Sequence, residues 1–339
     1  MAFIQKTPRK IYTPSNDDLA RIDKIKKVCE TSCNMKVIFI APKANLPQKL
    51  IEKIEKLAEV HFFEDDPVDI SKIDLLKEKG EKILCPFPEP MAWKFPNEFI
   101  KDIPDLKAIC LSTTSFNWVD GKLARSLNVH LTNVPNPPNA VAEGAISMML
   151  VVARRYALFI KGETFEFIPE NYLLEVKGKT LGIIGLGRIG RRIAELGNAL
   201  GMNVVYWSKS SRNKKYQYLD LDDLLKKSDF VFPCIALNEE TRNFVSRKKI
   251  DVMKPTASLI LITPNDIVDI DYLITKVANH KLFGCAFQED EKPLSEFKGN
   301  VFTTPRNNWY TKETVDEKMK IWIDNIIGAI KNKPIHLVN

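Results

Sequence analysis

The sequence of 339 residues has no apolar run long enough to cross a bilayer, no signal-peptide pattern and no framework of paired cysteines. Its longest apolar candidate, residues 145–153, has about half of the roughly 20 residues that a membrane-spanning helix needs. Six cysteines are scattered along the chain, and although Cys29 and Cys33 lie one helical turn apart, no second pair completes a metal site. We therefore expect a reduced, cytoplasmic protein with no metal and no membrane attachment.

The sequence also has little concentration of charge, although its formal net charge is +7. The lysines are spread over the whole chain, and no expected helix carries a basic stripe beside aromatic residues. This distribution is typical of a solvated surface with a weak attraction for small anionic ligands, and it gives no support for a nucleic-acid partner.

Short apolar segments alternate with helical patterns in two series, which predicts two parallel sheets with helices on both faces. A length of 339 residues also fits two domains. The first series has expected strands at residues 36–40, 60–63, 82–86, 106–112 and 129–133, with helices at 46–59, 69–80 and 119–127. The second has expected strands at residues 180–187, 203–208, 230–236, 258–263, 282–287 and 300–305.

Four further segments organise the chain. Residues 1–35 precede the first strand and contain a helical pattern that fits packing on the body or on a partner subunit. Residues 134–139 contain three prolines and are the expected linker. The nearly all-apolar helix at 140–156 is expected to be buried between domains or between subunits, and the amphipathic helix at 312–332 can return to the first domain.

The strongest local signal is the glycine pattern GLGRIG at residues 185–190, which follows a buried strand and opens a helix. Gly185 allows the tight turn, Gly187 lets the backbone approach a pyrophosphate, and Gly190 lets the helix pack closely on the strand. The N–H groups at the helix start, at Arg188 and Ile189, favour phosphate. This segment therefore predicts dinucleotide binding; the alternative is a glycine turn that only packs.

The end of the next strand is expected to select the cofactor. An acidic residue there would bind the ribose hydroxyls of NAD and repel a 2′-phosphate, but this sequence has Ser208, Lys209, Ser210, Ser211 and Arg212. Two cations and three hydroxyls suit charge-assisted hydrogen bonds to phosphate. We expect NADP(H) in preference to NAD(H), although a polar loop that tolerates either cofactor is the alternative.

In these motifs the chain resembles the D-isomer-specific 2-hydroxyacid dehydrogenases, the family of glyoxylate, hydroxypyruvate and phosphoglycerate dehydrogenases. The resemblance covers roughly residues 36–339, and the segments that carry it are NAVAEGAISMMLVVARR, GKTLGIIGLGRIG, LNEETRNFVSRKKIDVMKPTASLILI, IVDIDYLITKV, LFGCAF and PIHLVN. It implies two Rossmann-like, doubly wound domains, one flavodoxin-like and one dinucleotide-binding, with a cleft between them. It assigns 36–137 and 310–339 to a discontinuous substrate domain and 138–309 to the NAD(P)-binding domain, and it implies a homodimer.

The family transfers a hydride between the nicotinamide and C2 of a 2-oxo or 2-hydroxy acid, using an arginine, a glutamate and a histidine. By alignment with the family patterns, the arginine position here is Pro264, the glutamate position is Lys292 and the histidine position is Arg306. The glutamate position stays open because the segment is one residue shorter than the pattern, and Glu289, Asp290 and Glu291 lie nearby as alternatives.

The resemblance also indicates the residues around substrate and cofactor. Thr113, Thr114 and Ser115 lie in the loop that normally grips the substrate carboxylate with backbone N–H groups, and two of them stand where glycines are usual. Cys234 stands at a histidine position and Ala236 at a proline position beside the nicotinamide. The remaining residues expected near the cofactor are Thr241, Thr263 and Gln288.

Two functional hypotheses remain open. In the first, the protein is an oxidoreductase with an altered site, where Arg306 holds a small anionic substrate and Lys292, with its pKa lowered by burial and by Arg306, supplies the proton. In the second, it is a catalytically silent NADP(H)-binding protein that acts as a sensor or through a partner, because loss of the acid–base group alone costs ~10²–10⁴ in rate.

Overall fold

The computed structural model describes residues 35–163 and 166–339, which form two compact units. Of the described residues, unit 1 contains 35–136 together with Asp316–Asn339, and unit 2 contains those within Pro137–Val315. The expected helix within residues 1–35, with Cys29 and Cys33, lies outside the described residues.

Unit 1 is built on a five-stranded parallel sheet with the strand order β2-β1-β3-β4-β5. This is the flavodoxin-like order, in which the chain reverses its direction of progress beside the first strand. The strands are β1 Lys36–Ile40, β2 Glu59–Phe63, β3 Lys82–Pro86, β4 Leu106–Cys110 and β5 His130–Thr132. Strand β1 is almost entirely apolar because its two faces are both covered.

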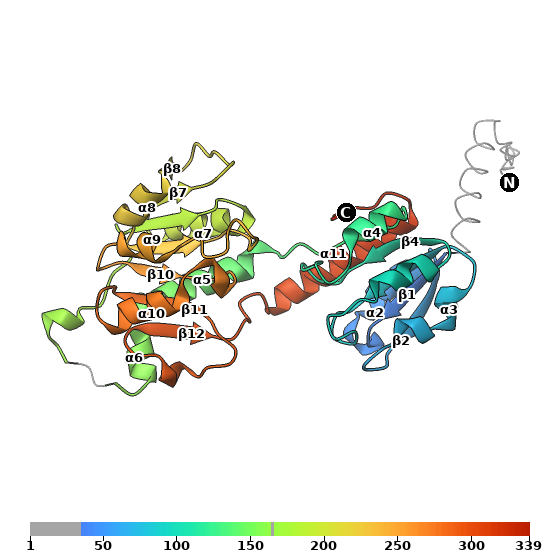
Figure 1. Ribbon diagram of the computed structural model, residues 1–339, viewed down its shortest axis with the longest axis horizontal. Coiled ribbons are helices and arrows are strands. Elements are labelled where there is room, and N and C mark those ends of the chain that lie inside the picture. The colour runs from blue at the N-terminus through green and yellow to red at the C-terminus, as the bar shows by residue number, and fades with distance from the viewer. Residues whose placement is uncertain (1–34, 164–165) are drawn as a thin grey trace, which may run out of the picture. The chain divides into compact units, whose positions relative to one another are not determined.

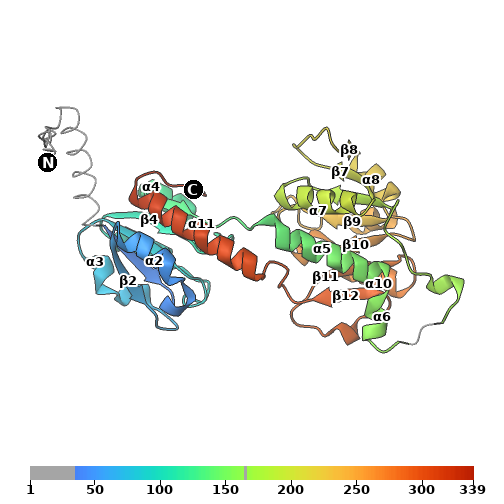
Figure 2. The same ribbon diagram turned by 180° about the vertical axis from the view of Figure 1, so that it is seen from behind.

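Alternate residues of β1 pack into two separate cores. Val37 and Phe39 belong to one core together with side chains of α2 (Gln48–Glu55) and of the part of α11 (Lys312–Ile330) that lies in unit 1. Figure 2 shows α2 and α11 on the side of the sheet that faces the viewer. Ile38 and Ile40 face the opposite core. That core is covered by the short elements η2 Ile70–Lys72, α3 Asp74–Lys77, η3 Asn97–Asp102 and α4 Gly121–Ser126.

Unit 2 is built on a seven-stranded parallel sheet with the order β12-β11-β10-β9-β6-β7-β8. The chain reverses its progress between β6 and β9, and open sheets of this kind bind ligands outside the carboxyl ends of the strands at such a point. The strands are β6 Thr180–Ile184, β7 Asn203–Trp207, β8 Gln217–Tyr218, β9 Phe230–Pro233, β10 Ser258–Ile260, β11 Gly284–Gln288 and β12 Val301–Thr304.

Helices cover both faces of this sheet. One face is packed against α5 (Pro138–Ala153) and α7 (Arg188–Ala199), which lie side by side in Figure 1. Nine side chains of α5 are buried, which explains its nearly all-apolar sequence. The other face is packed against α8 Leu221–Lys227, α9 Arg247–Asp251 and α10 Ile270–Ala278. The remaining elements are α6 Tyr156–Ile160 and the 3₁₀ turns η1 Lys43–Asn45, η4 Pro169–Asn171, η5 Asn265–Ile267 and η6 Leu294–Glu296.

The expected α/β fold with two doubly wound parallel sheets is confirmed, with local differences. The helix expected over residues 69–80 is split into η2 and α3, because Ile73 between them is extended. Strand β8 was not expected from the sequence, since its two residues carry no apolar run. Among the described residues, no helix has the length and apolarity needed to cross a membrane.

Candidate functional site

The glycine turn at the end of β6 has the geometry that its sequence predicts. Gly185 has φ +99°, a conformation that L side chains rarely adopt, and a Cβ there would lie 2.8 Å from the Cys234 carbonyl oxygen. A Cβ on Gly190 would lie 2.2 Å from the Gly185 carbonyl oxygen, so the helix packs directly on the turn. At Gly187, by contrast, a Cβ would meet nothing within 4 Å, so the backbone at the start of α7 borders open space.

The turn lies at the point where the sheet reverses. The Cys234 N–H donates to the Ile184 carbonyl at 2.7 Å, and the Gly185 N–H donates to the Trp207 carbonyl at 2.8 Å, so the ends of β6, β7 and β9 are held together. Burial raises the pKa of the Cys234 thiol to about 12. This side chain is therefore a neutral thiol at physiological pH, neither a nucleophile nor a useful proton donor.

The loop after β7 is an ordered turn. The buried Ser208 accepts a hydrogen bond at its Oγ from the Ser211 N–H at 3.1 Å. The Arg212 guanidinium donates to the carbonyls of Ser208 and Ser211, both at 3.0 Å, and lies over the Tyr218 ring with its Cζ 4.1 Å from the ring centroid. Stacking and hydrogen bonding hold this cation at the edge of the loop, and Tyr218 comes from β8, the strand that the sequence did not reveal.

The loop itself has no acidic residue, but a carboxylate from the loop after β9 lies beside it. Glu240 Oε2 is 2.6 Å from Lys209 Nζ, and both side chains are about three quarters exposed. The hydrogen bond from Lys209 lowers the pKa of Glu240, so the pair is charged on both sides at neutral pH. Lys209 is thus partly neutralised, whereas Arg212 is held by carbonyls and an aromatic ring and keeps its full charge.

Thr241, Thr263 and Gln288 mainly support the strand ends. Thr241 Oγ1 donates to the Ala236 carbonyl at 2.6 Å and accepts from the Asn238 N–H at 2.7 Å, which orders the loop after β9. Thr263 Oγ1 lies 3.4 Å from the Pro233 carbonyl. Gln288 Nε2 donates to the Pro305 carbonyl at 3.1 Å.

The loop after β10 contains Pro264, the residue that the sequence resemblance puts at an arginine position, followed by Asn265. Pro264 is the N-cap residue of the 3₁₀ turn η5. Its hydrocarbon side chain can neither donate nor accept a proton. Asn265 Nδ2 donates to the Gln288 carbonyl at 3.1 Å, which ties the ends of β10 and β11 together. This edge is therefore ordered but lacks a cation at the expected position.

Arg306 is paired with Asp290, a residue that the sequence interpretation left among several alternatives. The Arg306 N–H donates to Asp290 Oδ1 at 2.9 Å, and Arg306 Nε lies 3.1 Å from Asp290 Oδ2. The pair follows from the register of β11 and β12, because Gln288 lies opposite Thr304 and each partner is two residues further on. The Arg306 side chain is 66% exposed, so the guanidinium is reachable by a ligand.

Beside this pair is a hollow of about 370 Å³, lined by Glu289–Leu294 and by Thr303, Thr304 and Pro305. Lys292 lies at its rim and is exposed within unit 2. Lys292 is therefore not buried within its own unit, and the residue that pairs with Arg306 is Asp290.

In unit 1, the loop after β4 uses its hydroxyl groups internally. Thr113 Oγ1 donates to the Ser115 carbonyl at 2.8 Å, and Thr114 Oγ1 donates to the Val134 carbonyl at 2.7 Å. Trp118 Nε1 also donates to the Ser115 carbonyl, at 3.0 Å. The hydroxyls of the two threonines therefore brace the loop internally.

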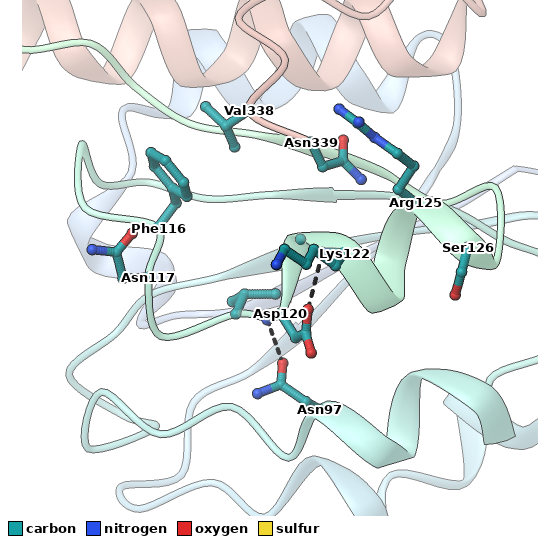
Figure 3. Close-up of a pocket in the computed structure, with 11 residues that line it drawn as sticks. Asn97, Phe116, Asn117, Asp120, Lys122, Arg125, Ser126, Val338 and Asn339 are labelled. Atoms are coloured by element: carbon teal, nitrogen blue, oxygen red, sulfur yellow. Dashed lines mark hydrogen bonds between the residues drawn. The ribbon is translucent and has the colours of Figure 1, made fainter.

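A larger hollow of about 710 Å³ lies beside this loop and was not indicated by the sequence (Figure 3). Its polar groups are largely used within the fold: Asp120 Oδ1 accepts from the Lys122 and Leu123 N–H groups, and Asn339 Oδ1 accepts from the Leu131 N–H at 2.9 Å. The chain end forms one wall, so the hollow marks where the C-terminal segment docks on α4 and β5.

Comparisons with known proteins agree with this geometry. The model of the D-isomer specific 2-hydroxyacid dehydrogenase NAD-binding domain matches residues 146–306. A glyoxylate reductase of Aeropyrum pernix is 31% identical over 265 residues, covering 71% of this chain and 79% of the relative. A glyoxylate reductase of Thermococcus litoralis is 28% identical over 315 residues, covering 87% of this chain and 94% of the relative.

A solved structure also matches over nearly the whole chain. It is an acyclic imino acid reductase in complex with NADPH and D-Arg, 28% identical, with a TM-score of 0.74, covering 90% of this chain and all of that chain. A protein of Thermus thermophilus is 25% identical with a TM-score of 0.74, covering 90% of this chain and all of that chain. The fold, the glycine turn and these similarities together show that the chain belongs to the D-isomer specific 2-hydroxyacid dehydrogenase family.

Proposed function

We propose that this protein is an NADP(H)-dependent oxidoreductase that acts at C2 of a small 2-oxo or 2-hydroxy acid or a close analogue, with an altered set of groups around the reacting carbon. The observation that carries the proposal is the open backbone at Gly187, set between a glycine with positive φ and a helix start at the reversal point of a parallel sheet.

The residues at this point fit a dinucleotide. The turn Gly185–Gly190 and the start of α7 offer backbone N–H groups and the positive end of a helix of 12 residues to a pyrophosphate. A bound nicotinamide would supply the hydride. The neutral Cys234 thiol and the braced Thr241 and Thr263 provide an uncharged surface at the ends of β9 and β10.

A preference for the phosphorylated cofactor is supported by the loop after β7. Arg212 is a stacked cation that stands beside the Ser208 hydroxyl, and a guanidinium in this setting matches a 2′-phosphate well. The acyclic imino acid reductase that resembles this chain was solved with NADPH. Lys209, being paired with Glu240, contributes less than its sequence position implied.

The substrate carboxylate is held, on this proposal, by a cation of unit 2. Arg306 binds the substrate carboxylate, since its guanidinium is permanently charged, two-thirds exposed and oriented by Asp290. Unit 1 serves as the substrate domain, with the backbone N–H groups of the braced Thr113–Ser115 loop available for an anion.

The protein is proposed to act as a homodimer through the segment that follows α5. Exposed apolar side chains gather there in sequence: Tyr156, Phe159 and Ile160 in α6, followed by Phe167 and Tyr172. Ile160 is 64% exposed and Tyr172 is 69% exposed, and a second copy of the chain is the partner that the family resemblance implies.

Calorimetric titration with NADPH and NADH tests the cofactor proposal. NADPH is expected to bind at least about tenfold more tightly, because a charge-assisted pair contributes on the order of 1.5–3 kcal/mol. Ser208→Asp should reduce or reverse this preference without unfolding, since an aspartate can accept the same hydrogen bond from the Ser211 N–H. The matched control is Ser295→Asp, at an exposed serine of η6.

An unchanged NADPH-to-NADH ratio in Ser208→Asp would show that this loop does not select the cofactor. Absence of binding heat with both nucleotides would contradict the proposed function itself. Tight binding of NADPH without turnover of any substrate would leave a nucleotide-binding protein that acts as a sensor.

A further inference from the structure

We infer that the compound reduced at this site is a 2-imino acid, in which C2 is double-bonded to a protonated nitrogen, and that a 2-oxo acid reacts only after condensing with ammonia or a primary amine. This inference rests on the proposed function and names its substrate class. The observation that carries it is the Asp290–Arg306 pair at the ends of β11 and β12, because the family resemblance puts Arg306 at the position of the proton-donating histidine.

Reduction of a carbonyl needs a proton for the oxygen atom, and the described strand ends of unit 2 offer few groups that could supply one. Lys292 lines the hollow there, but it is exposed within its unit, and an ordinary ammonium group is a poor acid at neutral pH. Arg306 keeps its proton at all ordinary pH values, and Pro264 has none. The Cys234 thiol has a pKa of about 12. His280 is the one histidine in the sequence of residues 137–315, and it lies at the end of α10 before β11, at the amino ends of the strands.

A protonated imine avoids this requirement because its nitrogen already carries the proton. The hydride brings two electrons from the reduced nicotinamide and forms a C–H bond at C2. The π electrons of the C=N bond move to nitrogen, which becomes a neutral amine. The amine then takes a proton from water on release, so no side chain of the protein has to give or receive a proton during the hydride step.

The charges at the site also match this class of compound. A 2-imino acid is a zwitterion, with a negative carboxylate and a positive iminium on adjacent carbons, whereas a 2-oxo acid carries only the negative charge. Arg306 and Asp290 present one fixed positive and one negative group side by side, 3.1 Å apart. Arg306 can therefore bind the carboxylate, while the negative Asp290 attracts the positively charged iminium.

The immediate surroundings do not overturn this match. The strand ends after β11 and β12 carry three carboxylates and two cations: Glu289, Asp290, Glu291, Lys292 and Arg306. The net charge of these five side chains is therefore −1, which favours a ligand that carries a positive group beside its carboxylate over a ligand that is only an anion.

The kinetic test compares NADPH oxidation by a panel of 2-oxo acids alone and with added ammonium or methylammonium. The rate is expected to be at least about 100-fold higher with the amine, because the loss of acid–base catalysis lowers the rate of carbonyl reduction by a factor of ~10²–10⁴. The pH profile should follow the pKa of the imine and shift when methylamine replaces ammonia.

A binding test gives a readout that does not depend on turnover. In the presence of NADP⁺, calorimetry should show the 2-amino acid binding at least about tenfold more tightly than the 2-hydroxy acid of the same side chain, and Asp290→Asn should remove most of this difference. Glu296→Gln is the matched control, since Glu296 is an exposed carboxylate of η6 outside the hollow.

The outcomes separate the inference from the proposed function. Oxidation of NADPH by a 2-oxo acid at the same rate with and without amine would overturn the inference and leave the reductase proposal in place. Tight NADPH binding with no oxidation in either arm would overturn both the inference and the reductase proposal. Equal binding of the amino and hydroxy acids would also overturn the inference.

Discussion

Replacing Gly190 with alanine tests the packing that forms the nucleotide cradle. The new Cβ would lie 2.2 Å from the Gly185 carbonyl oxygen, whereas ordinary contacts begin near 3.4 Å. Helix α7 would have to move away from the turn by about 1.2 Å, the difference between these two distances. The atom that the new methyl group meets belongs to the backbone, so no side-chain rotation can relieve the contact.

Two opposing effects set the size of the change. Overpacking of this kind costs about 3 kcal/mol, at the upper end of the usual range, because the new methyl group meets backbone. Alanine is favoured over glycine inside a helix by about 1 kcal/mol, which offsets part of that cost. The net loss of about 2 kcal/mol corresponds to a fall of roughly 4–8 °C in the unfolding temperature of a unit of this size.

The matched variant is Gly187→Ala, because a Cβ there meets nothing within 4 Å. Thermal unfolding followed by circular dichroism should change little, by about 1 kcal/mol or less for an alanine at the helix N-cap. NADPH affinity, measured by fluorescence titration, should nevertheless fall at least about tenfold, since the methyl group occupies the space offered to the pyrophosphate. Unaltered unfolding of Gly190→Ala, or unaltered NADPH affinity of Gly187→Ala, would refute this account of the turn.

Two further predictions concern reactivity and assembly. At pH 8, about one in ten thousand of the Cys234 side chains is a thiolate, since burial holds its pKa at about 12. Peptide mapping after iodoacetamide treatment should therefore show only trace labelling of Cys234 that does not reach a plateau between pH 7 and 9; a plateau in that range would contradict the burial. Ile160→Glu places a charge on an exposed apolar side chain and should shift light-scattering mass from dimer to monomer, whereas an unchanged mass would exclude this segment as the interface.

The features that the sequence predicted well are local. The glycine turn is encoded within six consecutive residues, and the apolar strands and helices alternate in an order that allows few sheet arrangements. Strand β8 escaped prediction because two residues give no periodic signal, yet it supplies the Tyr218 ring beneath Arg212.

The features that the sequence did not settle depend on register and on distant segments. Asp290 meets Arg306 because Gln288 lies opposite Thr304, and a segment one residue shorter than the family pattern left three neighbouring residues as alternatives. Glu240 lies 31 residues from Lys209 in the sequence, on a loop that follows a different strand. No local sequence pattern predicts such a contact, because the order of the strands in the sheet brings the two loops together.

Transfer of deuterium from NADPH labelled at both C4 positions most directly tests whether this protein reduces an imine. The protein would be incubated with the labelled cofactor, a 2-oxo acid and ammonium, and the product analysed by mass spectrometry. The account predicts a 2-amino acid one mass unit heavier, with the deuterium at C2. A deuterated 2-hydroxy acid formed in place of the amine, or no deuterated product despite bound nucleotide, would contradict it.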